Sequence, residues 1–394
     1  MLIDLKKSTL LPAIILFILF VNTAITFSAV SSFQMVSYAC LGIEILSLIL
    51  IINLYFRNNE VTWYDGVIIL FFLFIIGSTF INSTSVKDAF YKSTESLLLM
   101  MMFRYYRQNC KMVITVAFIA LSFAIYLNFA YMLMNPTWLV ETEKEVSGYL
   151  LGGNYNQMGG RMLCAIVTGI VCVRYSKLWL INLIPLTIIS VTSVSLVSST
   201  TSLACIILFI VLACIPSSAL KVLASVCISI FVLIFQVFVV FSGKGVENNP
   251  VIVYIVQDVF EKDLTFTNRT SMWDASLRAF SDSPLIGWGY VDTDWYVTRM
   301  ESSAVGPHNF LLQVLINGGV VLLILFAIFC YMSLKDIRKN MSNELSTIVF
   351  GIVIMSLMMT MEVYPYFYVI YMFMLVYYYN DYSKQNIKVK EGLS

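Results

Sequence analysis

Long apolar stretches recur along this chain from its first residues to its last, and they limit the folds that are open to it. Each stretch has about 18 residues or more, enough to cross about 30 Å of hydrocarbon as an α-helix. Of the 394 residues, 59% are hydrophobic and only 12% are charged, whereas a soluble domain carries about 25% charged residues. The chain is therefore predicted to be an all-α polytopic membrane protein.

Hydropathy along the chain predicts twelve membrane-spanning helices in a single integral membrane domain, residues 1–394. The fourth helix is interrupted by charges, of which Lys92 and Glu95 are three residues apart and are expected to pair. The predicted spans are residues 10–30, 36–56, 64–81, 88–106, 112–134, 157–175, 178–196, 201–215, 219–242, 308–332, 345–361 and 363–380.

Lysine and arginine are distributed unevenly between the predicted loops, and this fixes the orientation. With the N-terminus inside, fifteen of the 24 basic residues fall in cytoplasmic segments. Four lie on the outer side in or beside short loops, and the others lie in one long loop, which the positive-inside rule exempts. We expect both termini in the cytoplasm.

Two extracytoplasmic segments follow from this topology: a short loop, residues 135–156, and a large loop, residues 243–307. A connection of about 65 residues is far longer than helices need, and such loops are usually functional or disordered. Trp273, Leu277 and Phe280 recur at helical spacing, and Ser283-Pro284 marks a turn. We expect the large loop to be partly helical.

His308 is the one histidine of the sequence and lies in Gly306-Pro307-His308-Asn309, where the large loop re-enters the membrane. The pKa of imidazole is the nearest to neutrality among side chains, which suits removal of a proton from a hydroxyl or orientation of it. The alternative interpretation is a polar cap at the start of a helix.

Arginines on the outer side are candidates for binding a diphosphate, because a guanidinium group pairs with two phosphate oxygens at once. Arg269 precedes the helical run of the large loop and Arg278 lies within it, although both could be ordinary solvated arginines. Arg161 enters the sixth span behind a glycine-rich run; it either faces a cavity or partner or snorkels to the headgroups. Glu44, inside the second span, is expected to pair with Arg161 or with a hydroxyl.

Nucleotide-dependent chemistry has little support in the sequence. Asp292-Thr293-Asp294 has the spacing of the carboxylates that hold Mg²⁺ or Mn²⁺ in sugar-nucleotide transferases, but the pattern is short and common. A glycine-rich phosphate loop with a lysine does not occur in the sequence. ATP-driven chemistry is not expected.

Four segments together resemble the O-antigen ligase and repeat-unit polymerase superfamily of bacterial glycan assembly. They are Asn154-Tyr155-Asn156 with the glycines around it, Phe266–Trp273, Asp282–Tyr290 and His308–Gly319. Their order around one long outer loop matches the family, and the resemblance covers about residues 150–330. Family members often carry Ser-Arg-Gly-Ala near the eighth span, where this chain has Ser198-Ser199-Thr200-Thr201-Ser202. One expected cation is missing there, and Arg161 is a candidate replacement.

The resemblance implies a membrane glycosyltransferase of GT-C-like architecture in the bacterial plasma (inner) membrane, with its active site facing the extracytoplasmic side. It implies an undecaprenyl-diphosphate-linked glycan donor and a glycan acceptor, a surrounding of membrane lipids, and neither metal nor other cofactor. No nucleic acid is expected to bind, whereas a flippase and a chain-length regulator are expected as partners. The implied site residues are His308 and Arg269 for catalysis, and Arg161, Arg278, Asn154, Asn156, Asn309 and Glu44 for binding of diphosphate or substrate.

The leading hypothesis is a polymerase that joins repeat units into a capsule, an exopolysaccharide or an O-antigen. A ligase that transfers finished polymer to an acceptor has nearly the same chemistry and stays open. A flippase or transporter of lipid-linked units is disfavoured by the single enlarged loop and by the lack of a visible internal repeat. A scaffold without catalysis is the remaining alternative.

Overall fold

The computed structural model describes residues 7–25, 34–58, 61–135, 149–152, 155–243, 245, 250, 269–300 and 306–390. In these ranges the regular elements are helices, and extended backbone pairs only in an isolated bridge between Ile25 and Leu151. The predicted all-α class is therefore confirmed for the described residues.

A helix occupies each of the twelve predicted spans, and two further helices lie in the large loop. The spans correspond to α1 (Lys7–Ala24), α2 (Gln34–Asn58), α3 (Trp63–Asn82), α4 (Val86–Tyr105), α5 (Cys110–Met134), α6 (Tyr155–Tyr175), α7 (Leu180–Leu196), α8 (Thr200–Cys214), α9 (Ser218–Phe235), α13 (Phe310–Leu334), α14 (Asn343–Met358) and α15 (Tyr366–Lys390). The helices in the large loop are α11 (Arg269–Asp282) and α12 (Thr293–Met300).

Six helical segments of the described chain are long and apolar enough to cross a membrane: Trp63–Asn82, Arg107–Met134, Tyr155–Tyr175, Lys177–Leu196, Ser218–Val240 and Phe310–Leu334. Shorter apolar helices are Leu10–Ala24, Tyr38–Ile52, Thr200–Cys214 and Asn343–Met358. The charge-bearing α4 and the tyrosine-rich α15 belong to neither group. The chain is a membrane protein by these criteria, and twelve crossings remain a prediction.

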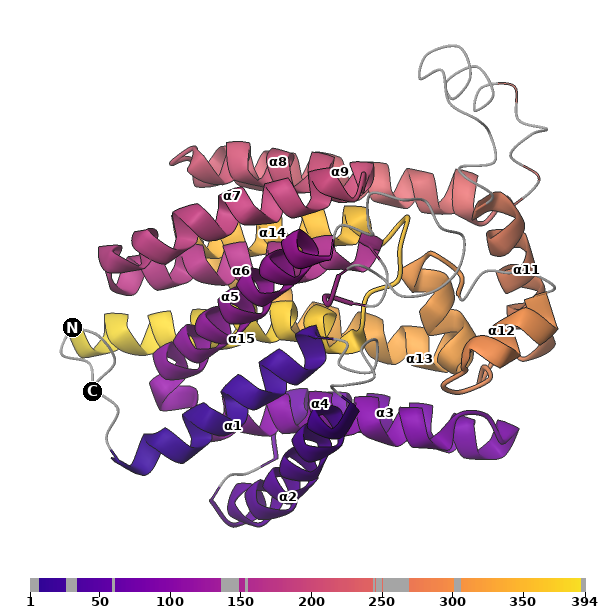
Figure 1. Ribbon diagram of the computed structural model, residues 1–394, viewed down its shortest axis with the longest axis horizontal. Coiled ribbons are helices and arrows are strands. Elements are labelled where there is room, and N and C mark those ends of the chain that lie inside the picture. Colours follow the sequence, from indigo (N-terminus) through magenta and orange to yellow (C-terminus); the bar gives the residue numbers. More distant parts are fainter. Residues whose placement is uncertain are drawn as a thin grey trace.

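The helices lie side by side in a bundle with two distinct ends (Figure 1). The first turn of α1 and the last turn of α15 lie at one end, and α11 and α12 lie at the other. Helix α15 is in the interior, where Tyr368, Tyr371 and Tyr378 are fully buried. The Tyr371 hydroxyl lies 2.8 Å from that of Thr168, and the Tyr368 hydroxyl lies 3.3 Å from that of Thr23. These contacts satisfy phenol groups that would otherwise be costly to bury.

Helix α13 is broken at Gly318 and Gly319, and residues 283–290, here called the clamp loop, fill the break. A break frees backbone groups, which cannot stay unpaired in a membrane interior. The amides of Trp288 and Gly289 donate to the carbonyls of residues 316 and 317, at 2.6 and 3.0 Å. The amides of residues 320 and 321 donate to the carbonyls of Pro284 and Leu285, at 2.9 and 3.3 Å. Gly319 has φ +60°, and a Cβ there would lie 2.5 Å from the Leu285 backbone, so only glycine fits.

The end of α3 holds the clamp loop from its other side. Ser78 Oγ donates to the carbonyl of residue 286 at 2.6 Å, and Asn82 Nδ2 donates to the carbonyl of residue 287 at 3.1 Å. The Thr79 hydroxyl accepts from the amide of residue 290 at 2.8 Å. A Cβ on Gly289 would lie 2.3 Å from Thr79 Cα, which explains the second glycine of the motif. The clamp loop therefore fixes α3, α11 and α13 relative to one another.

Helix α11 runs alongside the first half of α13 in the same direction. The indole of Trp273 is fully buried in a cluster that includes Leu312. The clamp loop, which follows α11, reaches the amide of Val320 further along α13. The starts of both helices are thus at the same end of the pair, which places Arg269 and His308 on the same side of the molecule.

Candidate active site

His308 lies just before α13 with its backbone in the left-handed region. Its φ is +44°, a conformation that a residue with a side chain adopts only when its surroundings enforce it. The amide of Phe310 donates to the carbonyl of Met359 at 3.0 Å, which ties the start of α13 to the segment between α14 and α15. The His308 side chain is 20% exposed, so it contacts the interior and remains accessible. Such backbone conformations cluster at active sites.

Asn309 fixes the first turn of α13. Its Oδ1 caps the helix by accepting from the amide of Leu312 at 3.0 Å, and its Nδ2 donates to the carbonyl of Thr360 at 3.0 Å. A reciprocal amide pair with Gln236, at 2.9 and 3.1 Å, joins it to a π-helical turn, Gln236–Val240, at the end of α9. Asn309 is fully buried and these contacts occupy its amide. These contacts hold the residue next to His308 in place, and substrate binding by Asn309 stays a prediction.

Glu362 is the partner of His308 that the sequence interpretation missed. Its Oε2 lies 3.0 Å from His308 Nδ1, and its side chain is only 6% exposed. A carboxylate only accepts hydrogen bonds, so Nδ1 is the donor, and in the neutral imidazole Nε2 then presents a lone pair. The other carboxylate oxygen accepts from the amide of Val363 at 3.0 Å. A signal existed in the sequence, because Glu362 is the one charged residue of residues 345–380.

Arg161 lies in the second turn of α6 and is buried, with 4% of its surface exposed. Its guanidinium group sits 5.1 Å from the centre of the Tyr368 ring, and Nη1 donates to the carbonyl of Gln157 at 3.1 Å. Gly152 makes room for it: that residue has φ +84°, and a Cβ there would lie 2.5 Å from Nη1. The glycine-rich run thus packs around a buried cation, and the role of Arg161 in binding diphosphate stays a prediction.

The segment that carries Glu362 also reaches Arg161. The Tyr364 hydroxyl donates to the carbonyl of Asn156 at 3.1 Å. Its ring lies against Gly160, where a Cβ would be 2.4 Å from the ring. Because Tyr364 follows Glu362 by two residues and Gly160 directly precedes Arg161, the segment that carries Glu362 packs against the first turns of α6, which carry Arg161.

The serine run near the eighth span contacts the same part of α6. Ser199 Oγ donates to Asn156 Oδ1 at 3.0 Å, and Ser202 Oγ donates to the carbonyl of Asn156 at 3.3 Å. Where the family often has a cation, this chain therefore has hydroxyls that hold the start of the helix carrying Arg161. Asn156 lies at the predicted site, and Asn154 falls outside the described residues.

The two arginines of α11 differ in their surroundings. Arg269 is the first residue of the helix, where the helix dipole adds to its positive charge. Arg278 pairs with Asp274, one turn earlier, and its side chain is 67% exposed. That is an ordinary surface ion pair, which favours the solvated arginine over the diphosphate role as the interpretation of Arg278. Asp292, from the candidate carboxylate pair, accepts from the amide of Trp295 at 2.9 Å and so caps α12.

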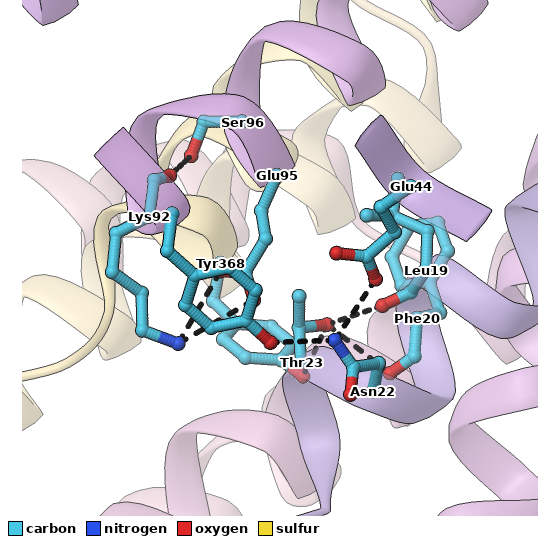
Figure 2. Close-up of polar contacts among 10 residues, drawn as sticks. Leu19, Phe20, Asn22, Thr23, Glu44, Lys92, Glu95, Ser96 and Tyr368 are labelled. Carbon is cyan, nitrogen blue, oxygen red and sulfur yellow. Dashed lines mark hydrogen bonds and ion pairs between the residues drawn. The ribbon is translucent and has the colours of Figure 1, made fainter. Parts of the chain in front are cut away.

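Glu44 does not pair with Arg161 but lies in a second polar group beside the site. It is fully buried, and its Oε1 accepts from Asn22 Nδ2 at 2.9 Å (Figure 2). Lys92 and Glu95 pair at 3.4 Å, as predicted from their spacing.

The assembled side chains provide a base and fixed cations at one end of a helical bundle. Nε2 of His308 can take a proton from a hydroxyl, with Glu362 stabilising the imidazolium that results. Arg161, buried, and Arg269, on the same side as His308, can stabilise negative charge that grows on a leaving group. The site therefore suits transfer of a group from an anionic carrier to a hydroxyl.

Comparison with known protein families shows that the model of the O-antigen ligase family fits residues 181–327. The matched stretch runs from α7 into α13 and contains Arg269, the clamp loop and His308. No curated protein matches the chain.

Proposed function

We propose that the chain is a glycosyltransferase acting on undecaprenyl-diphosphate-linked oligosaccharides, because the model of the O-antigen ligase family fits residues 181–327. The form of the reaction that we put first is polymerisation of repeat units into a surface polysaccharide. The observation that carries the proposal is the His308–Glu362 pair, at 3.0 Å, on a segment that packs against the start of α6, where Arg161 is buried.

The proposed step is a direct displacement at the anomeric carbon of the donor sugar. A hydroxyl oxygen of the acceptor glycan forms the new bond to that carbon, and the bond from the carbon to the diphosphate oxygen breaks. The hydroxyl proton goes to His308 Nε2, and undecaprenyl diphosphate leaves with the bonding electron pair. Glu362 holds the imidazole in the tautomer that can take the proton.

The arginines are proposed to bind the diphosphate and to stabilise it as it leaves. Negative charge grows on the bridging oxygen as the bond breaks, and cations fixed in a water-poor site stabilise that charge more than water does. Arg161 already lies desolvated against Tyr368, and Arg269 adds a second charge at the start of α11. The proposal needs no metal ion, so transfer activity in membranes is expected to persist in EDTA.

We place this site on the extracytoplasmic side of the plasma membrane. Two observations support the orientation: the excess of basic residues in the loops on the opposite side, and the position of α11 and α12 at the bundle end away from the start of α1.

A ligase is the second candidate, and the description of the matching family favours it. Carrier-lipid analysis in a strain lacking this gene separates the two. Single repeat units accumulating on undecaprenyl diphosphate identify a polymerase, whereas intact polymer accumulating on the carrier identifies a ligase.

The catalytic assignment is tested in the same strain by complementation. His308→Ala and Arg269→Ala are expected to abolish glycan transfer while the protein stays in the membrane at normal levels. Arg278→Ala is the matched control on the same helix, because its side chain is surface-paired, and it should restore transfer. Normal transfer from His308→Ala would contradict the assignment.

A further inference from the structure

A cluster of buried polar side chains lies next to Arg161, where α1, α2 and α4 meet. It consists of Asn22, Glu44, Tyr91, Lys92 and Glu95, and is here called the Asn22 cluster (Figure 2). Glu44 and Glu95 are 0% and 1% exposed, and Asn22 is 6% exposed. Two buried carboxylates in an apolar bundle are expensive unless something binds them.

The hydrogen bonds within the cluster leave one carboxyl oxygen, Oε2 of Glu44, without a donor. Asn22 Nδ2 donates to Glu44 Oε1 at 2.9 Å and to the Tyr91 hydroxyl at 2.7 Å, which uses both of its hydrogens. Lys92 Nζ lies 3.4 Å from each oxygen of Glu95. Glu44 Oε2 is buried and has no hydrogen-bond partner among the described residues. A buried carboxylate oxygen in this state is destabilising, so a donor from outside the chain would be bound favourably.

The cluster adjoins the proposed diphosphate site through two side chains. Thr23, the neighbour of Asn22, lies 3.3 Å from the Tyr368 hydroxyl, and the Tyr368 ring lies under the Arg161 guanidinium at 5.1 Å. The Lys92 side chain is 38% exposed, so one edge of the cluster reaches the surface. A group attached to a diphosphate at Arg161 would therefore be near the unpaired oxygen.

The charged side chains of the Asn22 cluster indicate which kind of sugar it would bind. The cluster holds two carboxyl groups and one lysine, which already pairs with Glu95, so it offers little to a carboxylate-bearing sugar and favours a neutral one that donates hydroxyl hydrogens. We propose that the Asn22 cluster is the subsite for a neutral sugar attached to the diphosphate of the donor, with a sugar hydroxyl donating to Glu44 Oε2. This inference rests on the proposed function, whose diphosphate site it extends.

The test compares two carriers with purified protein in lipid nanodiscs. The probes are undecaprenyl diphosphate alone and undecaprenyl diphosphate that carries N-acetylglucosamine, and the dissociation constant of each is measured. Wild type is expected to bind the sugar-bearing carrier about two- to tenfold more tightly, as one added hydrogen bond implies. Glu44→Leu removes the acceptor, and Glu44→Asp keeps the carboxyl group but places it one methylene further from the sugar. Both variants should bind the two carriers with equal affinity.

Ser47→Ala is the matched control, because Ser47 is a buried polar residue one turn from Glu44 on α2, and it should keep the preference for the sugar. If the Glu44→Leu protein fails to fold, the dissociation constants of the two carriers for Glu44→Asp decide the test. Equal binding of both carriers by wild type, or a preference retained in the folded Glu44 variants, would overturn the subsite and leave the diphosphate site intact. Failure of wild type to bind either carrier would instead overturn the proposed function.

Discussion

Replacing Glu362 by glutamine changes charge with little change of volume, and so isolates what the carboxylate does for His308. In the wild type one oxygen accepts from His308 Nδ1 and the other from the amide of Val363, both at 3.0 Å. Glutamine has one acceptor oxygen and can keep only one of these bonds. If it keeps the bond to Val363, its amide donates to Nδ1, the imidazole proton moves to Nε2, and the base is lost.

The size of the effect follows from these contacts. A hydrogen bond to a charged group contributes about 1.5–3 kcal/mol and a neutral one about 0.5–1.5 kcal/mol, so loss of the charge alone slows transfer about five- to tenfold. Reversal of the tautomer costs more, about 10⁴-fold where a histidine–carboxylate pair of this kind drives serine hydrolases. The Glu362 side chain is only 6% exposed, so water compensates little. We expect Glu362→Gln to slow transfer by at least about fivefold.

The assay uses membranes from the deletion strain that express each variant at equal level, with lipid-linked glycan extracted from that strain as donor. The initial rate of glycan transfer is measured, and thermal unfolding in detergent reports the fold. Glu344→Gln is the matched control, because this carboxylate pairs with Arg174 at the other end of α14 and should leave the rate unchanged. A wild-type rate from folded Glu362→Gln would refute the positioning role of Glu362.

Three further substitutions test the framework and the cation. Gly319→Ala places a Cβ 2.5 Å from the Leu285 backbone at a residue with φ +60°. We expect this substitution to destabilise the fold by about 1–3 kcal/mol, measured as a lower melting temperature. The control Gly66→Ala, whose Cβ would meet nothing within 4 Å, should leave the melting temperature unchanged. Asn309→Ala removes a helix cap and a buried amide pair. It should lower the stability by about 1–2 kcal/mol and slow glycan transfer. An unchanged melting temperature would contradict the structural role of Asn309. Arg161→Lys keeps the charge but loses the planar fork, so binding of undecaprenyl diphosphate to the folded protein should weaken, and equal affinity would contradict diphosphate binding there.

The local features of the fold could be predicted from the sequence. Apolar stretches long enough to span a membrane coincide with helices because their length and composition leave few other structures in lipid. The Lys92–Glu95 pair was predictable because residues three apart share a helix face. The resemblance to the O-antigen ligase and polymerase superfamily, inferred from short motifs, is confirmed by the family match.

Contacts between distant segments could not be predicted in the same way. Glu362 is 54 residues from His308, and no local pattern marks the two as partners. The Asp282–Tyr290 motif and the glycines of α13 were noted in the sequence only as parts of the family resemblance, and the structure shows that they complete each other's backbone hydrogen bonds. Such bonds leave no side-chain signature, so the motif alone could not predict them. The surface ion pair of Arg278 was not predictable either, because a sequence does not show which face of α11 is exposed.

The most direct test of the account is release of undecaprenyl diphosphate from lipid-linked glycan by purified protein in proteoliposomes. The donor is the carrier-linked glycan that accumulates in the deletion strain, and product is quantified by mass spectrometry with wild type and His308→Ala side by side. The account predicts release by wild type, coupled to glycan transfer, and loss of both in His308→Ala. Equal release by the folded His308→Ala protein would contradict it.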